Sequence, residues 1–231
     1  MRGVCRRRRE AYRRRDRSTG LAWGRERVLG ALANTSGELL SDGEILFTRN
    51  EQLCIGELDG GVSARATRFA KAIDDSGVRA SAVNDIQSLE WSKFAAWAGM
   101  MALAITTRAV TWKYFADPDS ALVLARLIRE IGALSAARKI TLSDRSPLPV
   151  ATIGRVSEAE AVAIIQALGN QTRLSAPDHR ISTLQDLEGG RALEIEETLG
   201  YAVREAARLN LPLPLLECFY RLARGIDRTR R

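Results

Sequence analysis

The sequence predicts a mainly helical protein, in which a small α/β segment precedes an all-helical domain. After Asp85, every segment with a regular apolar pattern repeats at three or four residues, as amphipathic helices do. Between residues 26 and 83, short apolar runs alternate with glycine-containing turns, which indicates strands. The first residues have almost no apolar periodicity. We therefore expect a disordered tail (1–24), a partial α/β segment (25–84) and a helical domain (85–231).

The α/β segment contains few elements. Residues 28–32 are a short apolar run, and residues 43–48 and 52–56 read as a β-hairpin whose turn is Arg49-Asn50-Glu51. A helix over 64–76, ended by Gly77, and a strand over 78–83 are expected next. This is too little material for a complete doubly wound sheet.

The helical domain carries clear start signals. Asp117-Pro118 is a polar cap followed by proline in the first turn, and Ser157 with Glu160 forms a capping box. A break at Pro212 and Pro214 precedes the last helix. The spacing predicts helices over residues 86–108, 118–139, 157–168, 192–209 and 215–226.

Residues 182–196 are unusually rich in hydroxyl, amide, carboxylate and guanidinium groups. Large apolar side chains recur only at Leu184, Leu187, Leu193 and Ile195, so the stretch reads as two helical pieces joined at Gly189-Gly190. A solvated helix–turn–helix surface and a functional site both fit this pattern, and the stretch alone leaves the two open.

Charge and composition argue against nucleic-acid-binding and membrane-spanning proteins. The first 20 residues hold nine arginines and two carboxylates, an excess equal to the net charge of +7 of the whole chain, so the predicted folded part has no overall attraction for phosphate. The tail fits a nucleic-acid- or membrane-surface-binding arm, a transit peptide or an extension without function; we favour the last, and nucleic acid is not an expected partner. No run of about 18 apolar residues predicts a membrane span.

The sequence offers few candidates for metal-binding, phosphate-binding or catalytic residues. Three widely separated cysteines suit neither a disulfide framework nor a zinc cluster, so we expect a cytoplasmic protein without a metal. His179 is the only histidine and receives no role. No Gly-x-Gly occurs among the 18 glycines, so a dinucleotide fingerprint and a P-loop are both absent. Lys93, early in an apolar helix, either extends to solvent or lies near a cleft, where Glu194 is the natural carboxylate to meet it.

A set of motifs in order and spacing resembles one family. Residues from about 25 to 224 are similar to the later part of 2-dehydropantoate 2-reductase, also called ketopantoate reductase. The matching motifs are Ile55-Gly56-Glu57, Asp59-Gly60, Ser63-x-Arg65, Asp85-Ile86, Trp91-Ser92-Lys93-Phe94, Ser182-x-x-Gln185-Asp186, Gly190-Arg191-x-x-Glu194-Ile195, Gly200 and Pro214.

The resemblance implies a fold and an activity. The helical domain would be of the ketopantoate reductase and 6-phosphogluconate dehydrogenase-like type, after the closing strands of a Rossmann domain whose nucleotide-binding front half is missing. The family reduces 2-dehydropantoate to pantoate with NADPH, in the pathway to pantothenate and coenzyme A, which implies a small 2-oxo acid as substrate and a possible homodimer.

The resemblance also implies roles for single residues. Lys93 matches the catalytic lysine that protonates the carbonyl oxygen, and a cationic acid suits that step because it stabilises developing alkoxide charge. Ser182 and Glu194 match substrate-binding residues, whereas Asp186 and Arg191 match positions that support the turn. No cofactor-binding residue is assigned.

Two departures leave alternatives open. Trp97 and Met101 stand where well-studied members carry asparagines that help to bind substrate, which fits a reductase of a different 2-oxo acid. The missing front half fits an enzyme that is inactive alone, or a non-catalytic helical domain that mediates dimerisation or another interaction.

Overall fold

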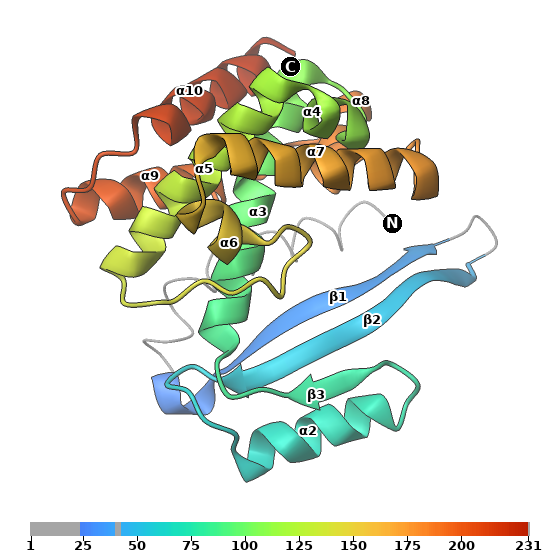
Figure 1. Cartoon of the computed structure of the whole chain (residues 1–231). Helices are drawn as coiled ribbons and strands as arrows, with labels where there is room; N and C mark the ends of the chain where they lie inside the picture. Colours follow the sequence, from blue (N-terminus) through green and yellow to red (C-terminus); the bar gives the residue numbers. More distant parts are fainter. Residues whose placement is uncertain (1–23, 40–42, 231) are drawn as a thin grey trace. The chain divides into compact units, whose positions relative to one another are not determined.

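The computed structural model describes residues 24–39 and 43–230, and the predicted disordered tail lies almost entirely outside them. These residues form two units, and the boundary falls between Glu90 and Trp91, within helix α3 (Ile86–Thr107) (Figure 1). The predicted domain boundary, after residue 84, instead coincides with the start of that helix.

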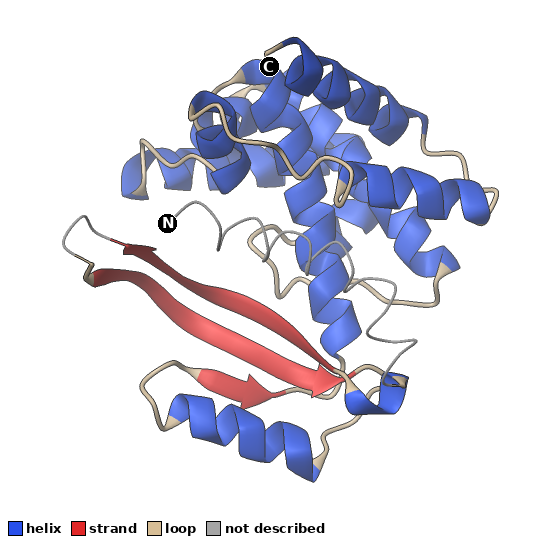
Figure 2. Ribbon diagram, turned by 180° about the vertical axis from the view of Figure 1, so that it is seen from behind, coloured by secondary structure: helices blue, strands red, loops and turns tan. Residues whose placement is uncertain are grey.

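The first unit is built on a three-stranded sheet among the described residues, in the order β1-β2-β3 (Figure 2). β1 (Leu29–Leu39) pairs antiparallel with β2 (Ile45–Glu57), which pairs parallel with the short β3 (Ala80–Ala82). A turn of 3-10 helix, η1 (Arg25–Arg27), precedes β1, and helix α2 (Ala64–Asp74) connects β2 to β3.

The predicted hairpin at Arg49-Asn50-Glu51 is wrong, because these residues continue β2 without a break. β1 provides their pairing partners, with Thr35 opposite Asn50 and Ser36 opposite Arg49. Register shifts beside these pairs accommodate the irregular stretch. β1 instead ends at Leu39 opposite Ile45, the first residue of β2, and Gly43 shortly before β2 takes a left-handed φ of 91°.

A pair of glycines allows α3 to begin close against this sheet. Gly30 and Gly56 are cross-strand partners. A Cβ at Gly30 would lie 2.8 Å from Ile86 Cγ2, and one at Gly56 would lie 2.9 Å from Ile86 Cβ. Ile86 is fully buried there, with Cys54 and Leu32 in the same cluster. On the other face of the sheet, Ile55 packs against the alanines of α2.

The N-terminus of α2 is fixed to the end of β2 by a carboxylate. The Ser63 hydroxyl donates to Glu57 and accepts the N–H of Ala66, which caps the helix. Arg65 Nε donates to Glu57 Oε1 at 2.7 Å, and its Nη2 donates to the second oxygen. These hydrogen bonds, the one from Arg65 first, lower the pKa of Glu57 to about 2.

This pKa predicts a specific acid sensitivity. A depressed carboxylate pKa contributes stability that is fully present above the ordinary value of 4.5 and is lost as the pH falls toward about 2. In urea titrations across that window, the wild type should therefore lose more stability than Glu57→Gln. Arg65→Gln should flatten the same window, and identical pH profiles for all three chains would contradict the assignment.

The second unit contains the remaining helices. Its helices are α4 (Thr111–Ala116), α5 (Pro118–Ala137), α6 (Val150–Arg155), α7 (Glu158–Ser175), α8 (Ser182–Glu188), α9 (Leu199–Arg208) and α10 (Pro214–Thr229), together with most of α3. α5 packs against α4, α6, α7, α9 and α10, and its Leu124 lies close to Gly99 of α3. Its side chains Leu124, Leu127, Ile128, Ile131 and Leu134 are fully buried. No described helix is long and apolar enough to cross a membrane.

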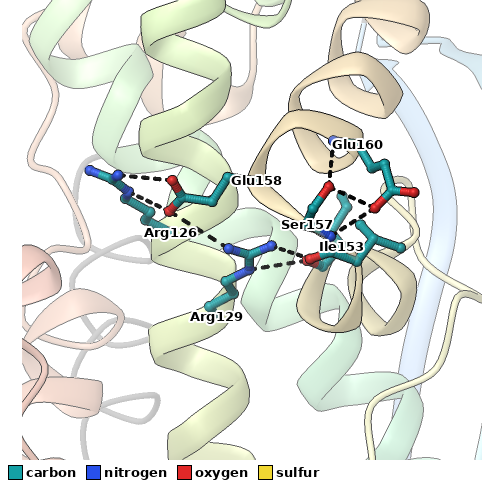
Figure 3. Close-up of polar contacts among 7 residues, drawn as sticks. Arg126, Arg129, Ile153, Ser157, Glu158 and Glu160 are labelled. Atoms are coloured by element: carbon teal, nitrogen blue, oxygen red, sulfur yellow. Dashed lines mark hydrogen bonds and ion pairs between the residues drawn. The ribbon is translucent and has the colours of Figure 1, made fainter.

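Both predicted helix starts are confirmed. Asp117 caps α5 by accepting the N–H of Ser120 at 2.7 Å. The capping box of Ser157 and Glu160 opens α7, which continues past residue 168 to Ser175. Figure 3 shows this box beside Glu158, to which Arg126 of α5 donates at 2.8 Å. The predicted helix over 86–108 is confirmed by α3.

One helix prediction is wrong at its start. Residues 192–198 are not helical, and α9 begins only at Leu199. Leu193 and Ile195 are both buried in the core although they lie two positions apart, a spacing that one face of a helix cannot satisfy. The short helices α4 and α6 were not predicted, because six residues are too few to show a period.

Candidate functional site

Lys93 lies on α3, in the second unit, and its neighbours fix the rotation of the helix. Ser92 is fully buried and its hydroxyl accepts the N–H of Ser143 at 2.8 Å. The ring of Phe94 packs edge-on against Tyr201 of α9, with centroids 6.4 Å apart. Lys93 is half-buried between these two anchored residues. Trp97, also half-buried, follows one turn later on the same face.

An arginine connects this part of α3 to the ends of two other helices. Arg138 follows the last residue of α5. Its guanidinium lies 5.3 Å from the centre of the Trp91 ring on α3. Its Nη1 also donates to Glu205 of α9. Arg208 binds the same carboxylate at 3.1 Å, and the hydrogen bond from Arg208 is the main reason why the pKa of Glu205 is lowered. The segment that carries Lys93 is thus held by side chains from α5 and α9.

Ser182 is the first residue of α8 and is exposed. The helix is anchored by the next two residues, Thr183 and Leu184, which are buried. Arg191 closes the turn after α8: its Nε donates to the Asp186 carboxylate and its N–H donates to the Asp186 carbonyl at 2.8 Å. Gly190, with a φ of 67°, supplies the left-handed residue that this turn needs.

Glu194 is exposed on an irregular segment, residues 193–198, that is held at several points. Leu193 and Ile195 on either side of it are buried. The Thr198 hydroxyl donates to the Glu194 carbonyl and lies 3.2 Å from Met101 Sδ on α3. The Glu196 carboxylate is bound by Arg204 of α9 and by Tyr220 and Arg224 of α10. The Glu194 side chain therefore extends from a backbone whose position is fixed, as a binding site requires.

The structure places all three predicted site residues in the helical unit. It brings the segment of Glu194 against α3 at Met101, two turns after Lys93, through Thr198. Met101 is 1% exposed, so it serves as a packing residue. The roles of Lys93, Ser182 and Glu194 remain predictions.

Sequence reasoning missed Thr198, Glu196 and Arg138. Thr198 stands directly ahead of α9, and a shorter predicted helix would have marked it as a start residue. Glu196 and Arg138 had no comparable signal, since their partners lie far along the chain. His179 has a structural contact, because its Nδ1 lies 2.9 Å from the hydroxyl of Thr111 at the start of α4.

The hydroxyl of Thr198 should limit motion of the Glu194 segment. Replacing it in Thr198→Val removes a donor to the Glu194 carbonyl and should cost about 1 kcal/mol locally. Hydrogen exchange of the backbone amides in residues 193–200 should then be about fivefold faster. Thr229→Val, which removes a similar hydroxyl contact near the end of α10, is the control. Unchanged exchange in residues 193–200 would show that Thr198 does not hold the segment.

Residues 85–227 match the family described as ketopantoate reductase PanE/ApbA, C terminal. The match covers more than half of the chain, and it begins at the residue before α3. The chain therefore belongs to the ketopantoate reductase family and corresponds to the C-terminal portion of its members.

Named relatives agree with this assignment. The 2-dehydropantoate 2-reductase of Archaeoglobus fulgidus is 27% identical over 201 residues, which cover 87% of this chain and 61% of the relative. That of Mesorhizobium japonicum is 27% identical over 218 residues, which cover 90% of this chain and 58% of the relative. The chain thus spans about three fifths of the length of these relatives.

Solved structures share the fold. The 2-dehydropantoate 2-reductase of Methylococcus capsulatus superposes with a TM-score of 0.71 at 24% identity, covering 93% of this chain and 68% of that one. A D-mandelate dehydrogenase in complex with NADH gives a TM-score of 0.73 at 16% identity, covering 89% and 64%. The predicted mainly helical fold with a small α/β segment is confirmed.

Proposed function

We propose that this chain provides the substrate-binding and proton-donating part of a nicotinamide-dependent 2-oxo acid reductase of the 2-dehydropantoate 2-reductase type. The observation that carries the proposal is the half-buried Lys93 on a helix fixed from both sides, in a chain that matches the family from residue 85 onward. The family resemblance supports NADPH as the reductant, and its relatives' names support 2-dehydropantoate as the substrate.

Each site residue has a distinct task in this proposal. The Lys93 ammonium donates a proton to the carbonyl oxygen of the 2-oxo acid as it becomes an alkoxide, and the resulting amine takes a proton back from water. Glu194 accepts a hydrogen bond from a hydroxyl of the substrate, and Ser182 donates one to the substrate. Partial burial of Lys93 strengthens its attraction for the developing negative oxygen, because fewer water molecules screen it.

The described residues do not by themselves fit a dinucleotide. A bound nicotinamide cofactor supplies the hydride in this chemistry. However, the sequence has no Gly-x-Gly turn, and the described part of the sheet has three strands. We therefore assign no residue to the cofactor. Among the described residues, no group of three or more potential ligands is placed to hold a metal ion.

A reductase of a different 2-oxo acid is the second candidate. Trp97 is half-buried one turn after Lys93, and Met101 is fully buried against Thr198. An indole beside the proton donor favours an apolar substituent on the substrate over the hydroxylated one of 2-dehydropantoate. Comparing kcat/KM for 2-dehydropantoate and for 2-oxo acids with aryl side chains separates the two candidates.

A homodimer is also proposed, because a solved ketopantoate reductase from Staphylococcus aureus is described as dimeric. Light scattering of the purified chain tests this, and a monomer at all concentrations would refute it.

Calorimetric titration with 2-dehydropantoate, in the absence and presence of NADPH, tests the proposed function. Saturable binding of the 2-oxo acid is the expected result, because the proposal assigns the substrate and no cofactor residue to this chain. A chain that binds neither NADPH nor a 2-oxo acid would be a non-catalytic helical domain, and the proposal would be wrong.

A further inference from the structure

A hollow of about 500 Å³ lies in the second unit, between the second half of α5, residues 139–142 and α6. Its lining includes none of the predicted site residues Lys93, Ser182 and Glu194. Ligand sites commonly have this size. We propose that this α5–α6 groove binds a small organic anion, a carboxylate or phosphate monoester carried on an apolar body.

Glycines keep the groove open although packing does not require them. A Cβ at Gly154 of α6 would meet no atom within 4 Å, and one at Gly132 of α5 would meet only Leu142 Cδ1, at 3.6 Å. At Gly99, by contrast, a Cβ would lie 2.5 Å from Leu124. Glycine inside a helix costs about 1 kcal/mol relative to alanine. Gly132 and Gly154 thus lower the helix propensity of α5 and α6, and neither glycine is needed to avoid a clash between the two helices.

The walls of the groove are apolar. Ile128 and Val150 are fully buried beneath it, and Ile140 and Leu142 are half-buried along its side. A hydrocarbon or ring placed there would remove these side chains from water, which is favourable in proportion to the area covered. The walls therefore select the apolar body of the ligand.

The charges that line the groove are all positive. Arg129, Lys139 and Arg155 are among the lining residues, and no carboxylate is. Arg129 is held in place, since it donates to the carbonyls of Ile153 at 3.3 Å and Val156 at 2.6 Å (Figure 3). Lys139 and Arg155 are exposed. Guanidinium and ammonium groups recognise carboxylates and phosphates, so the lining selects an anion.

Nearby carboxylates already have partners. Asp144 accepts the N–H of Thr152 at 2.9 Å and its hydroxyl at 2.7 Å. Glu158 accepts from Arg126 at 2.8 Å and lies 3.7 Å from Arg129. Glu158 offsets part of the charge of Arg129, and Asp144 interacts electrostatically with Arg155. Three lining cations against these two carboxylates leave the groove and its edge with a net charge of 3 − 2 = +1.

The end of α5 places one of the lining cations, Lys139, at the groove. Lys139 follows the last turn of α5 with a left-handed φ of 62°. This conformation costs a residue other than glycine about 1 kcal/mol, and glycine is the usual occupant after a helix. A lysine here places an ammonium group on the groove instead. Arg108 after α3 and Asn210 after α9 take the same conformation, so what is particular to Lys139 is its place in the lining of the groove.

Calorimetric titration of the full chain tests the proposal with three probes that share an eight-carbon alkyl body: nonanoate, octyl phosphate and octylamine. The two anions should bind saturably and more weakly as salt is added, and the more tightly bound one identifies the head group. Octylamine should not bind. Absence of saturation with both anions, or equal binding of octylamine, would overturn the proposal.

Two substitutions then locate the site. Gly154→Leu fills the groove and should weaken anion binding at least tenfold without lowering the melting temperature, because leucine favours a helix and meets open space. Arg155→Glu reverses an exposed charge and should weaken binding by a similar factor. Gly225→Leu, on α10 and also in open space, is the control. Wild-type affinity in both groove variants would place the ligand elsewhere and overturn the assignment.

Discussion

Replacing Lys93 with methionine should lower the turnover of 2-oxo acid reduction by about 10² to 10⁴-fold, the usual contribution of a positioned general acid. Methionine keeps the length and apolar stem of the side chain, so α3 should retain its contacts through Ser92 and Phe94. In a chain that binds NADPH, the affinity for NADPH should change far less than the turnover, since Lys93 acts on the carbonyl oxygen. Stopped-flow measurement of NADPH oxidation separates the two quantities.

Lys113→Met provides the matched control, because Lys113 lies on α4 beside the ring of Trp112. It should leave turnover unchanged. If Lys93→Met reduced 2-oxo acids at the wild-type rate, Lys93 could not be the proton donor. Loss of activity in both variants would instead indicate a general effect of removing a lysine.

Replacing Gly99 with leucine should destabilise the helical unit by about 3 kcal/mol, the upper end of the usual cost of overpacking. A Cβ at this position would lie 2.5 Å from Leu124 Cδ1 and 3.6 Å from Leu127 Cβ, both on the central helix α5. The buried Leu124 would have to leave its rotamer or α3 would have to move away from α5, and either change disturbs the packing of the helix that carries Lys93. Urea unfolding should therefore show a lower midpoint, and turnover should fall in parallel.

Gly225→Leu on α10 is the control for this change, since its Cβ would meet no atom within 4 Å. It should not lower the midpoint. A midpoint for Gly99→Leu equal to that of the wild type would mean that α3 and α5 do not approach as closely as the structure shows.

Local signals in the sequence predicted much of the fold. The helix over 86–108 and the helix starts at Asp117 and Ser157 can be predicted from neighbouring residues, because caps and apolar spacing act within one or two turns. The strands were harder to predict. Arg49-Asn50-Glu51 lacks local strand character, and its place in β2 comes from pairing with β1.

In the candidate site, too, some features follow from local sequence and others from tertiary contacts. Lys93, Ser182 and Glu194 were predicted from motifs and stay predictions, and the structure shows what holds their backbones. The Glu194 segment depends on contacts of Thr198 with Met101 and of Glu196 with Tyr220, which join residues far apart in the chain. Helical periodicity had instead predicted a helix from residue 192. Tertiary contacts decided this segment, and no short pattern contains them.

We propose that this chain carries the substrate side of a 2-oxo acid reductase, with Lys93 as the proton donor. Saturation-transfer difference NMR of a 2-oxo acid in the presence of the chain tests this proposal most directly, because the measurement requires no turnover. Saturable binding that weakens strongly in Glu194→Gln and Lys93→Met, but not in Lys113→Met, is the predicted result. Binding that is absent, or equal in all four chains, would contradict the account.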